Sequence, residues 1–105
     1  QSMEALYAHY PGLMVMTPGT VEDAFSMLIE AVTIDDPVLF CEHKFLYNHL
    51  KADRLPELGM PALKARVARP GRDATIVTYG AMLHESLAAA DELVEDGYEI
   101  EVDYD

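Results

Sequence analysis

Apolar residues recur every three or four positions in three segments of the chain, which predicts three amphipathic helices. The first covers residues 2–10 and ends at Pro11-Gly12, a pair that breaks helices. The second begins at Val21, and Thr20 with Asp23 three residues later partly matches a helix-capping box. The apolar positions of the second and third helices are Ala24, Phe25, Leu28, Ile29 and Val32, and Met82, Leu83, Leu87, Ala90, Leu93 and Val94.

Short apolar runs between turn residues predict strands. They lie at residues 13–16, 38–41, 74–79 and 98–104, with an edge strand at 65–67. Residues 44–63 have weak periodicity and contain two prolines and a glycine, so we interpret them as a connector with one helical turn. Strands joined by helices of this length form right-handed crossovers and run parallel. The sequence therefore predicts an α/β fold with a mostly parallel sheet and crossover helices.

The charge balance is strongly acidic, with 7 Lys and Arg against 19 Asp and Glu in 105 residues and a net charge of -12. Such a field repels phosphates, which argues against nucleic acids and anionic membrane surfaces as partners. No apolar run approaches the roughly 18 residues of a membrane span, and the start lacks signal-peptide regions. We expect a cytoplasmic protein. A first residue Gln1 in place of Met indicates a processed, excised or trimmed chain.

Candidate reactive groups lie around Cys41, the single cysteine, which excludes an internal disulfide. We interpret Cys41 as a buried structural thiol. A nucleophilic cysteine needs a lowered thiol pKa, whereas the negative charge of the adjacent Glu42 would raise the pKa of Cys41. Glu42, His43 and His49 could bind a metal ion only if the connector folds them together, and a solvated loop is the alternative. The acidic residues within 91–105 lack EF-hand spacing and predict a solvated face. The residues themselves reveal no catalytic constellation.

Three segments, taken in order and spacing, carry a resemblance to a known family. They are QSMEALYAHYPGLMVMTP, DDPVLFCEHKFLY and ATIVTYGAMLHESLAAADELVEDGYEIEV. This series resembles the β subunit of the thiamine-diphosphate-dependent decarboxylating component of 2-oxo acid dehydrogenase complexes, which includes the pyruvate, branched-chain and acetoin members. The resemblance spans nearly the whole chain and implies a transketolase-like fragment that covers parts of two domains.

By this resemblance, residues 1–58 are the C-terminal part of a pyrimidine-binding domain, and residues 59–105 begin a transketolase C-terminal-like domain. The acidic residue that tautomerises the cofactor, and a functional histidine of the family, both precede the matching segment. No catalytic or cofactor-binding residue is therefore assigned here. Gln1, Ser2 and His9 lie nearest the active site by analogy.

The resemblance also implies a structural potassium site, formed mainly by backbone carbonyls at the turn that matches residues 31–37. Carried over by position, its ligands are Ala31, Ile34 and Asp36. Family members usually have Asp and Asn where this chain has Ile34 and Asp36. A plain helix-to-strand turn is the alternative interpretation.

Two functions from different classes follow. The resemblance implies an oxidoreductase of the 2-oxo acid dehydrogenase family, which uses thiamine diphosphate and magnesium with an α subunit and a lipoyl acyltransferase core. For the isolated chain we expect no activity and no bound cofactor, and a homo-oligomer because a truncated sheet leaves apolar faces uncovered. The alternative is a repurposed oligomeric binding protein or weak hydrolase. Its only acid–base candidates are the pairs His84-Glu85 and Glu42-His43.

Overall fold

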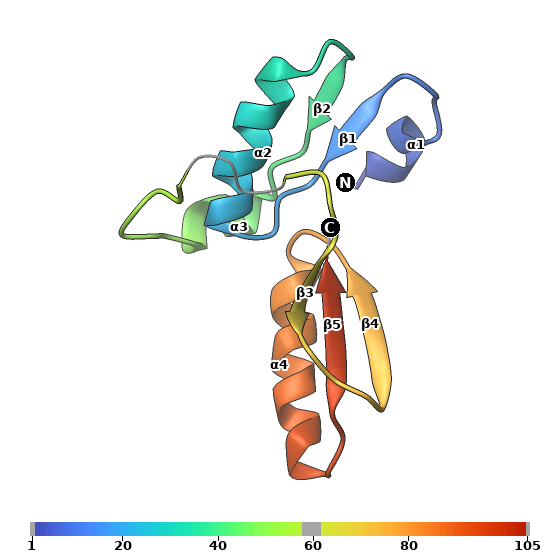
Figure 1. Ribbon diagram of the computed structural model, residues 1–105, viewed down its shortest axis with the longest axis vertical. Coiled ribbons are helices and arrows are strands. Elements are labelled where there is room, and N and C mark those ends of the chain that lie inside the picture. The colour runs from blue at the N-terminus through green and yellow to red at the C-terminus, as the bar shows by residue number, and fades with distance from the viewer. Residues whose placement is uncertain (1, 58–61, 105) are drawn as a thin grey trace.

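The computed structural model describes residues 2–57 and 62–104 and folds into two units, each with its own small sheet (Figure 1). The first unit contains α1 (Glu4–Ala8), β1 (Met14–Met16), α2 (Val21–Thr33), β2 (Val38–Phe40) and α3 (Lys44–His49). The second unit contains β3 (Arg66–Arg69), β4 (Ala74–Thr78), α4 (Met82–Glu95) and β5 (Ile100–Tyr104). The predicted α/β class is confirmed, and the interpreted connector holds a six-residue helix, α3.

Parallel pairing across a helical crossover occurs once in each unit. β1 pairs with β2 through α2, and β4 pairs with β5 through α4. β3 was expected as an edge strand and lies at the edge of the order β3-β5-β4, where it runs antiparallel to β5. The parallel strands therefore belong to two separate sheets, one of which is mixed.

The first unit is organised by α2, which begins where the sequence predicts. The Thr20 hydroxyl oxygen accepts a hydrogen bond from the Asp23 backbone N–H at 3.1 Å, which satisfies a free donor of the first turn. Met27 is buried and packs with Met16 and Ala62. The predicted apolar face of this helix is partly wrong, because much of it points outward. The outward residues are Leu28, Ile29 and Val32, which are 50%, 41% and 80% exposed.

The second unit has a core between α4 and one face of its sheet. The buried members are Leu83, Ala90, Ile100, Val102 and Tyr104. Alternate residues of β5 point into this core, which matches the predicted period of two. α4 ends before Gly97, whose φ of 86° is the left-handed conformation that favours glycine after a helix.

The molecule is elongated because the two cores do not merge. Its radius of gyration is 14.9 Å, whereas a compact chain of this length has about 13 Å. The two hydrophobic clusters share no residue. Across the described ranges, no helix combines the length and apolar character needed to cross a bilayer.

Candidate functional site

A cleft lies between the two units, at the carboxyl ends of three parallel strands. Thr17 follows β1, Cys41 follows β2 and Tyr79 follows β4, and all three residues line the cleft. Its volume is about 640 Å³. Open α/β sheets place ligands beyond the carboxyl ends of their strands, so this cleft is the first place to look for a functional site.

Charged groups of both signs reach this cleft from the first unit. Glu4 and Glu42 supply carboxylates, and His43 and Lys44 supply basic groups. Cys41 is half-buried rather than buried as expected. Burial first, and then the negative charge of Glu4, raise the pKa of the Cys41 thiol. The direction matches the sequence prediction, but the responsible carboxylate is Glu4 on α1 and not the adjacent Glu42. A protonated thiol at neutral pH is a weak nucleophile.

Alkylation of Cys41 by iodoacetamide tests this environment. We expect the rate to rise with pH and to reach half its maximum above about 8.5, the ordinary thiol pKa, because only the thiolate reacts. Glu4→Gln should move this midpoint to lower pH, whereas the matched Glu42→Gln should move it less. A midpoint below the ordinary thiol value, or a larger shift in Glu42→Gln, would contradict the assignment.

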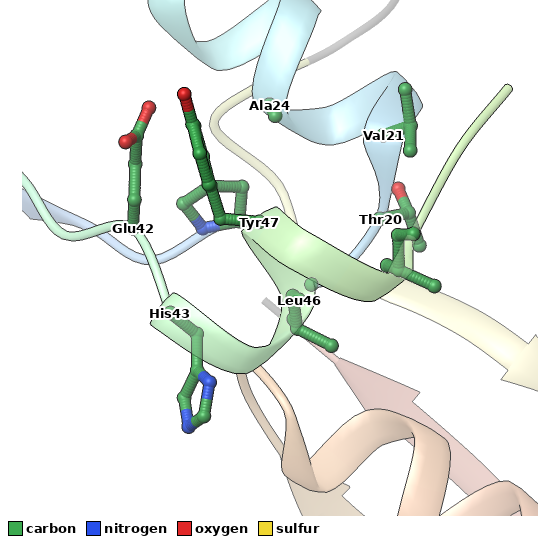
Figure 2. Close-up of a pocket in the computed structure, with 10 residues that line it drawn as sticks. Thr20, Val21, Ala24, Glu42, His43, Leu46 and Tyr47 are labelled. Atoms are coloured by element: carbon green, nitrogen blue, oxygen red, sulfur yellow. The ribbon is translucent and has the colours of Figure 1, made fainter.

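A smaller apolar pocket of about 130 Å³ lies between the start of α2 and α3. Figure 2 shows the side chains of Glu42 and Tyr47 pointing the same way, while His43 points to the opposite side of α3. The His43 ring accepts the Phe45 backbone N–H through Nδ1 at 3.2 Å, so His43 caps α3. His43 is therefore directed away from Glu42 and serves the helix end.

His49 and His84 each contact a backbone carbonyl, His49 within α3 and His84 in the other unit. His49 donates from Nδ1 to the Phe45 carbonyl at 2.8 Å and stacks on the Phe45 ring, with centroids 4.1 Å apart. His84 on α4 contacts the Gly19 carbonyl through Nε2 at 2.6 Å. Among the described residues no three His, Cys, Asp or Glu side chains come close enough to hold a metal ion. The structure thus does not assemble the metal group considered around Glu42, His43 and His49.

The residues placed nearest the active site by analogy are separated. Ser2 lines the cleft between the units. His9 is exposed at the end of α1 and packs edge-on against Tyr10, with ring centroids 5.7 Å apart. Gln1 falls outside the described residues.

Comparison with known proteins gives a consistent result. Residues 63–103 match the family "Transketolase, C-terminal domain". The chain is 48% identical over 103 residues to the pyruvate dehydrogenase E1 component subunit beta of Bacillus subtilis (strain 168), covering 96% of this chain and 31% of that protein. It is 43% identical over 104 residues to the acetoin:2,6-dichlorophenolindophenol oxidoreductase subunit beta of Cupriavidus necator, and the match covers 97% of this chain and 30% of that protein.

The 2-oxoisovalerate dehydrogenase subunit beta of Bacillus subtilis (strain 168) is 44% identical over 98 residues, which cover 92% of this chain and 30% of that protein. The chain matches a segment of 2-oxo acid dehydrogenase β subunits. The predicted resemblance is thereby confirmed. A solved structure described as "Split gene transketolase, inactive beta4 tetramer" shares the fold of this chain, with a TM-score of 0.74 and 25% sequence identity, and the match covers 96% of this chain and 33% of that one.

This chain spans about a third of the length of these relatives. The turn that the resemblance matches to a potassium site lies at the end of α2. Ala31 belongs to its last turn, where carbonyls have no partner within the helix. Ile34 is the C-cap residue with extended backbone, and Asp36 is exposed before β2. Backbone carbonyls of this kind are suitable donors for a monovalent cation.

The sequence patterns did not predict that Glu4, Thr17 and Tyr79 would line one cleft. Each is unremarkable in its local sequence. The available signal was topological, because parallel strands end at a common edge. Predicting the cleft also required knowing that the ends of β1 and β2 face the end of β4. This relation between the two units is not encoded by any local sequence pattern.

Proposed function

We propose that this chain forms the junction between the pyrimidine-binding domain and the transketolase C-terminal-like domain of a thiamine-dependent 2-oxo acid dehydrogenase β subunit. Residues 1–58 belong to the first domain and residues 59–105 to the second. The supporting observation is 48% identity to a pyruvate dehydrogenase β subunit across 96% of the chain. Two separate sheets and cores agree with such a junction.

In the assembled enzyme this segment acts in oxidative decarboxylation of a 2-oxo acid, with transfer of the acyl group to lipoamide. Its partners there are an α subunit and a lipoyl acyltransferase core. When bound, thiamine diphosphate supplies the carbanion chemistry of decarboxylation. The described residues offer no group of three His, Cys, Asp or Glu side chains that could hold the magnesium ion by themselves. Their contribution is to hold the two domains together, and we propose no catalytic step for them.

The 105-residue polypeptide alone is accordingly inactive and binds no thiamine diphosphate. Calorimetry with thiamine diphosphate and magnesium should give no heat of binding, and a 2-oxo acid decarboxylation assay should give no turnover. A complete β subunit combined with its α subunit is the positive control. Saturable heat from the isolated polypeptide would show that its own residues build a cofactor site and would overturn this proposal.

The isolated polypeptide also self-associates through the outward face of α2. Leu28, Ile29 and Val32 form an apolar strip there, and uncovered apolar surface of this kind marks contact sites. The similar split-gene transketolase is described as a beta4 tetramer. Light scattering should give a multiple of 11.7 kDa, and Val32→Asp should lower the mass. The exposed Val67→Asp on β3 is the matched control. A monodisperse monomer for the unaltered chain would contradict self-association.

The turn that follows α2 carries the proposed potassium site. Its ligands come from Ala31 in the last turn of the helix and from Ile34 and Asp36 after it. The Ile34 side chain packs toward the first core, so its carbonyl rather than its side chain is the available donor. Thr33 donates its hydroxyl to the Glu30 carbonyl at 2.8 Å and so occupies a neighbouring acceptor. The donor set of the proposal is the carbonyls of Ala31 and Ile34 together with Asp36, two positions later in the turn.

A further inference from the structure

Two tight turns bring the two units into contact. A Cβ atom on Gly19 would lie 3.0 Å from the Gly80 carbonyl oxygen and 3.3 Å from Leu83 Cδ2. The turn before α2 therefore packs directly on the turn before α4, at a distance tighter than most Cβ contacts in proteins. Across this contact, His84 donates from Nε2 to the Gly19 carbonyl at 2.6 Å.

A buried ion pair spans the same junction. Asp23 lies in the first turn of α2 and is completely buried, and Arg66 on β3 donates to its Oδ1. The Asp23 charge also raises the pKa of Tyr104 at the end of β5, after the larger effect of burial, so this phenol lies close to the carboxylate. Buried carboxylates in proteins are usually paired with a group of opposite charge. Arg66 supplies that charge from the second unit.

Apolar packing contributes little to this junction. The cluster around Leu83 and Val102 belongs entirely to the second unit. The cluster around Met16 and Met27 draws on the first unit and Ala62. The Asp23–Arg66 ion pair and the His84–Gly19 hydrogen bond are specific polar links across the junction, beside the contacts of Tyr104 with Asp23 and Thr20. The cleft that contains Cys41 is lined by residues of both units.

We propose that the Asp23–Arg66 ion pair and the His84–Gly19 hydrogen bond act together as a latch that fixes the separation of the two units and the width of the cleft between them. Breaking the latch lets the units move apart while each keeps its own core. This inference does not depend on the proposed enzymatic role.

Cys41 reports the state of the latch because it is the only cysteine and lines the cleft. We expect Arg66→Gln to be labelled by a maleimide about tenfold faster than the unaltered protein at the same pH and concentration, through local opening. Arg69→Gln is the matched control. It removes the same charge but breaks an exposed ion pair with Asp91 inside the second unit, and it should change the rate less than about twofold.

Amide hydrogen exchange separates opening of the latch from unfolding. In Arg66→Gln, the amides of α4 and β5 should retain their protection while Cys41 labelling accelerates. Unchanged labelling would overturn the proposal, and so would acceleration accompanied by lost protection in α4 and β5. Should Arg66→Gln fail to fold, His84→Ala provides the test, because it removes the hydrogen bond to Gly19 and leaves the Asp23–Arg66 ion pair in place. A labelling rate equal to that of the unaltered protein would then overturn the latch.

Discussion

Gly71→Ala is expected to destabilise the second unit by more than about 3 kcal/mol, the upper range for overpacking substitutions. A Cβ atom at this position would lie 2.3 Å from the Glu101 nitrogen, 2.4 Å from the Ile100 carbonyl carbon and 2.7 Å from the Glu99 carbonyl oxygen. All three are backbone atoms at the start of β5. They cannot move aside without disturbing the pairing of Ile100 with Ala74 on β4. Urea denaturation followed by circular dichroism measures the loss.

Gly97→Ala is the matched control for this substitution. Gly97 has a φ of 86°, but nothing lies within 4 Å of a Cβ built there. Its replacement therefore costs only the backbone strain of a left-handed alanine, about 1 kcal/mol. Equal losses for the two variants would show that the contact between Gly71 and the β5 backbone does not constrain the fold.

Leu83→Ala is expected to cost about 3 kcal/mol through the cavity it leaves in the second core. Leu83 is 1% exposed and packs among Ala90, Ile100 and Val102. Leu83 also contacts the turn at Gly19, so the cavity left by the substitution lies next to the contact between the two units. Chemical denaturation, monitored by the amide resonances of β5, measures the effect.

The neighbouring Met82→Ala provides the comparison, because Met82 is 56% exposed. Surface changes of this kind alter the free energy of unfolding by about 0.5 kcal/mol or less. A loss in Leu83→Ala no greater than that in Met82→Ala would mean that α4 does not pack on the sheet as described.

Local patterns predicted the elements well, because those elements depend on residues close in sequence. The cap of Thr20 on Asp23 and the alternation along β5 both follow from neighbouring positions. The buried side of α2 was harder to predict. Asp23, Ser26 and Met27 point inward while Val32 points out, because Asp23 is paired with Arg66, 43 positions later. No periodicity rule anticipates a buried carboxylate whose partner comes from another unit.

The candidate site shows the same division between local and distant causes. The sequence placed Cys41 at the end of a strand and gave the correct direction for its thiol pKa. The carboxylate acting on it, Glu4, lies 37 positions earlier in the chain and approaches only through the packing of α1 beside β1. His43 and His49 were considered as metal ligands, yet each uses its ring on the backbone of α3.

The strand order β3-β5-β4 has a consequence for how the protein is made. β5 is the central strand of its sheet, but it follows both of its neighbours in the chain. During synthesis β3 and β4 therefore leave the ribosome without a pairing partner, and the sheet closes only after residues 100–104 have emerged. Until then their edges are open to other chains. Chaperone demand during translation should accordingly fall at the point where β5 appears.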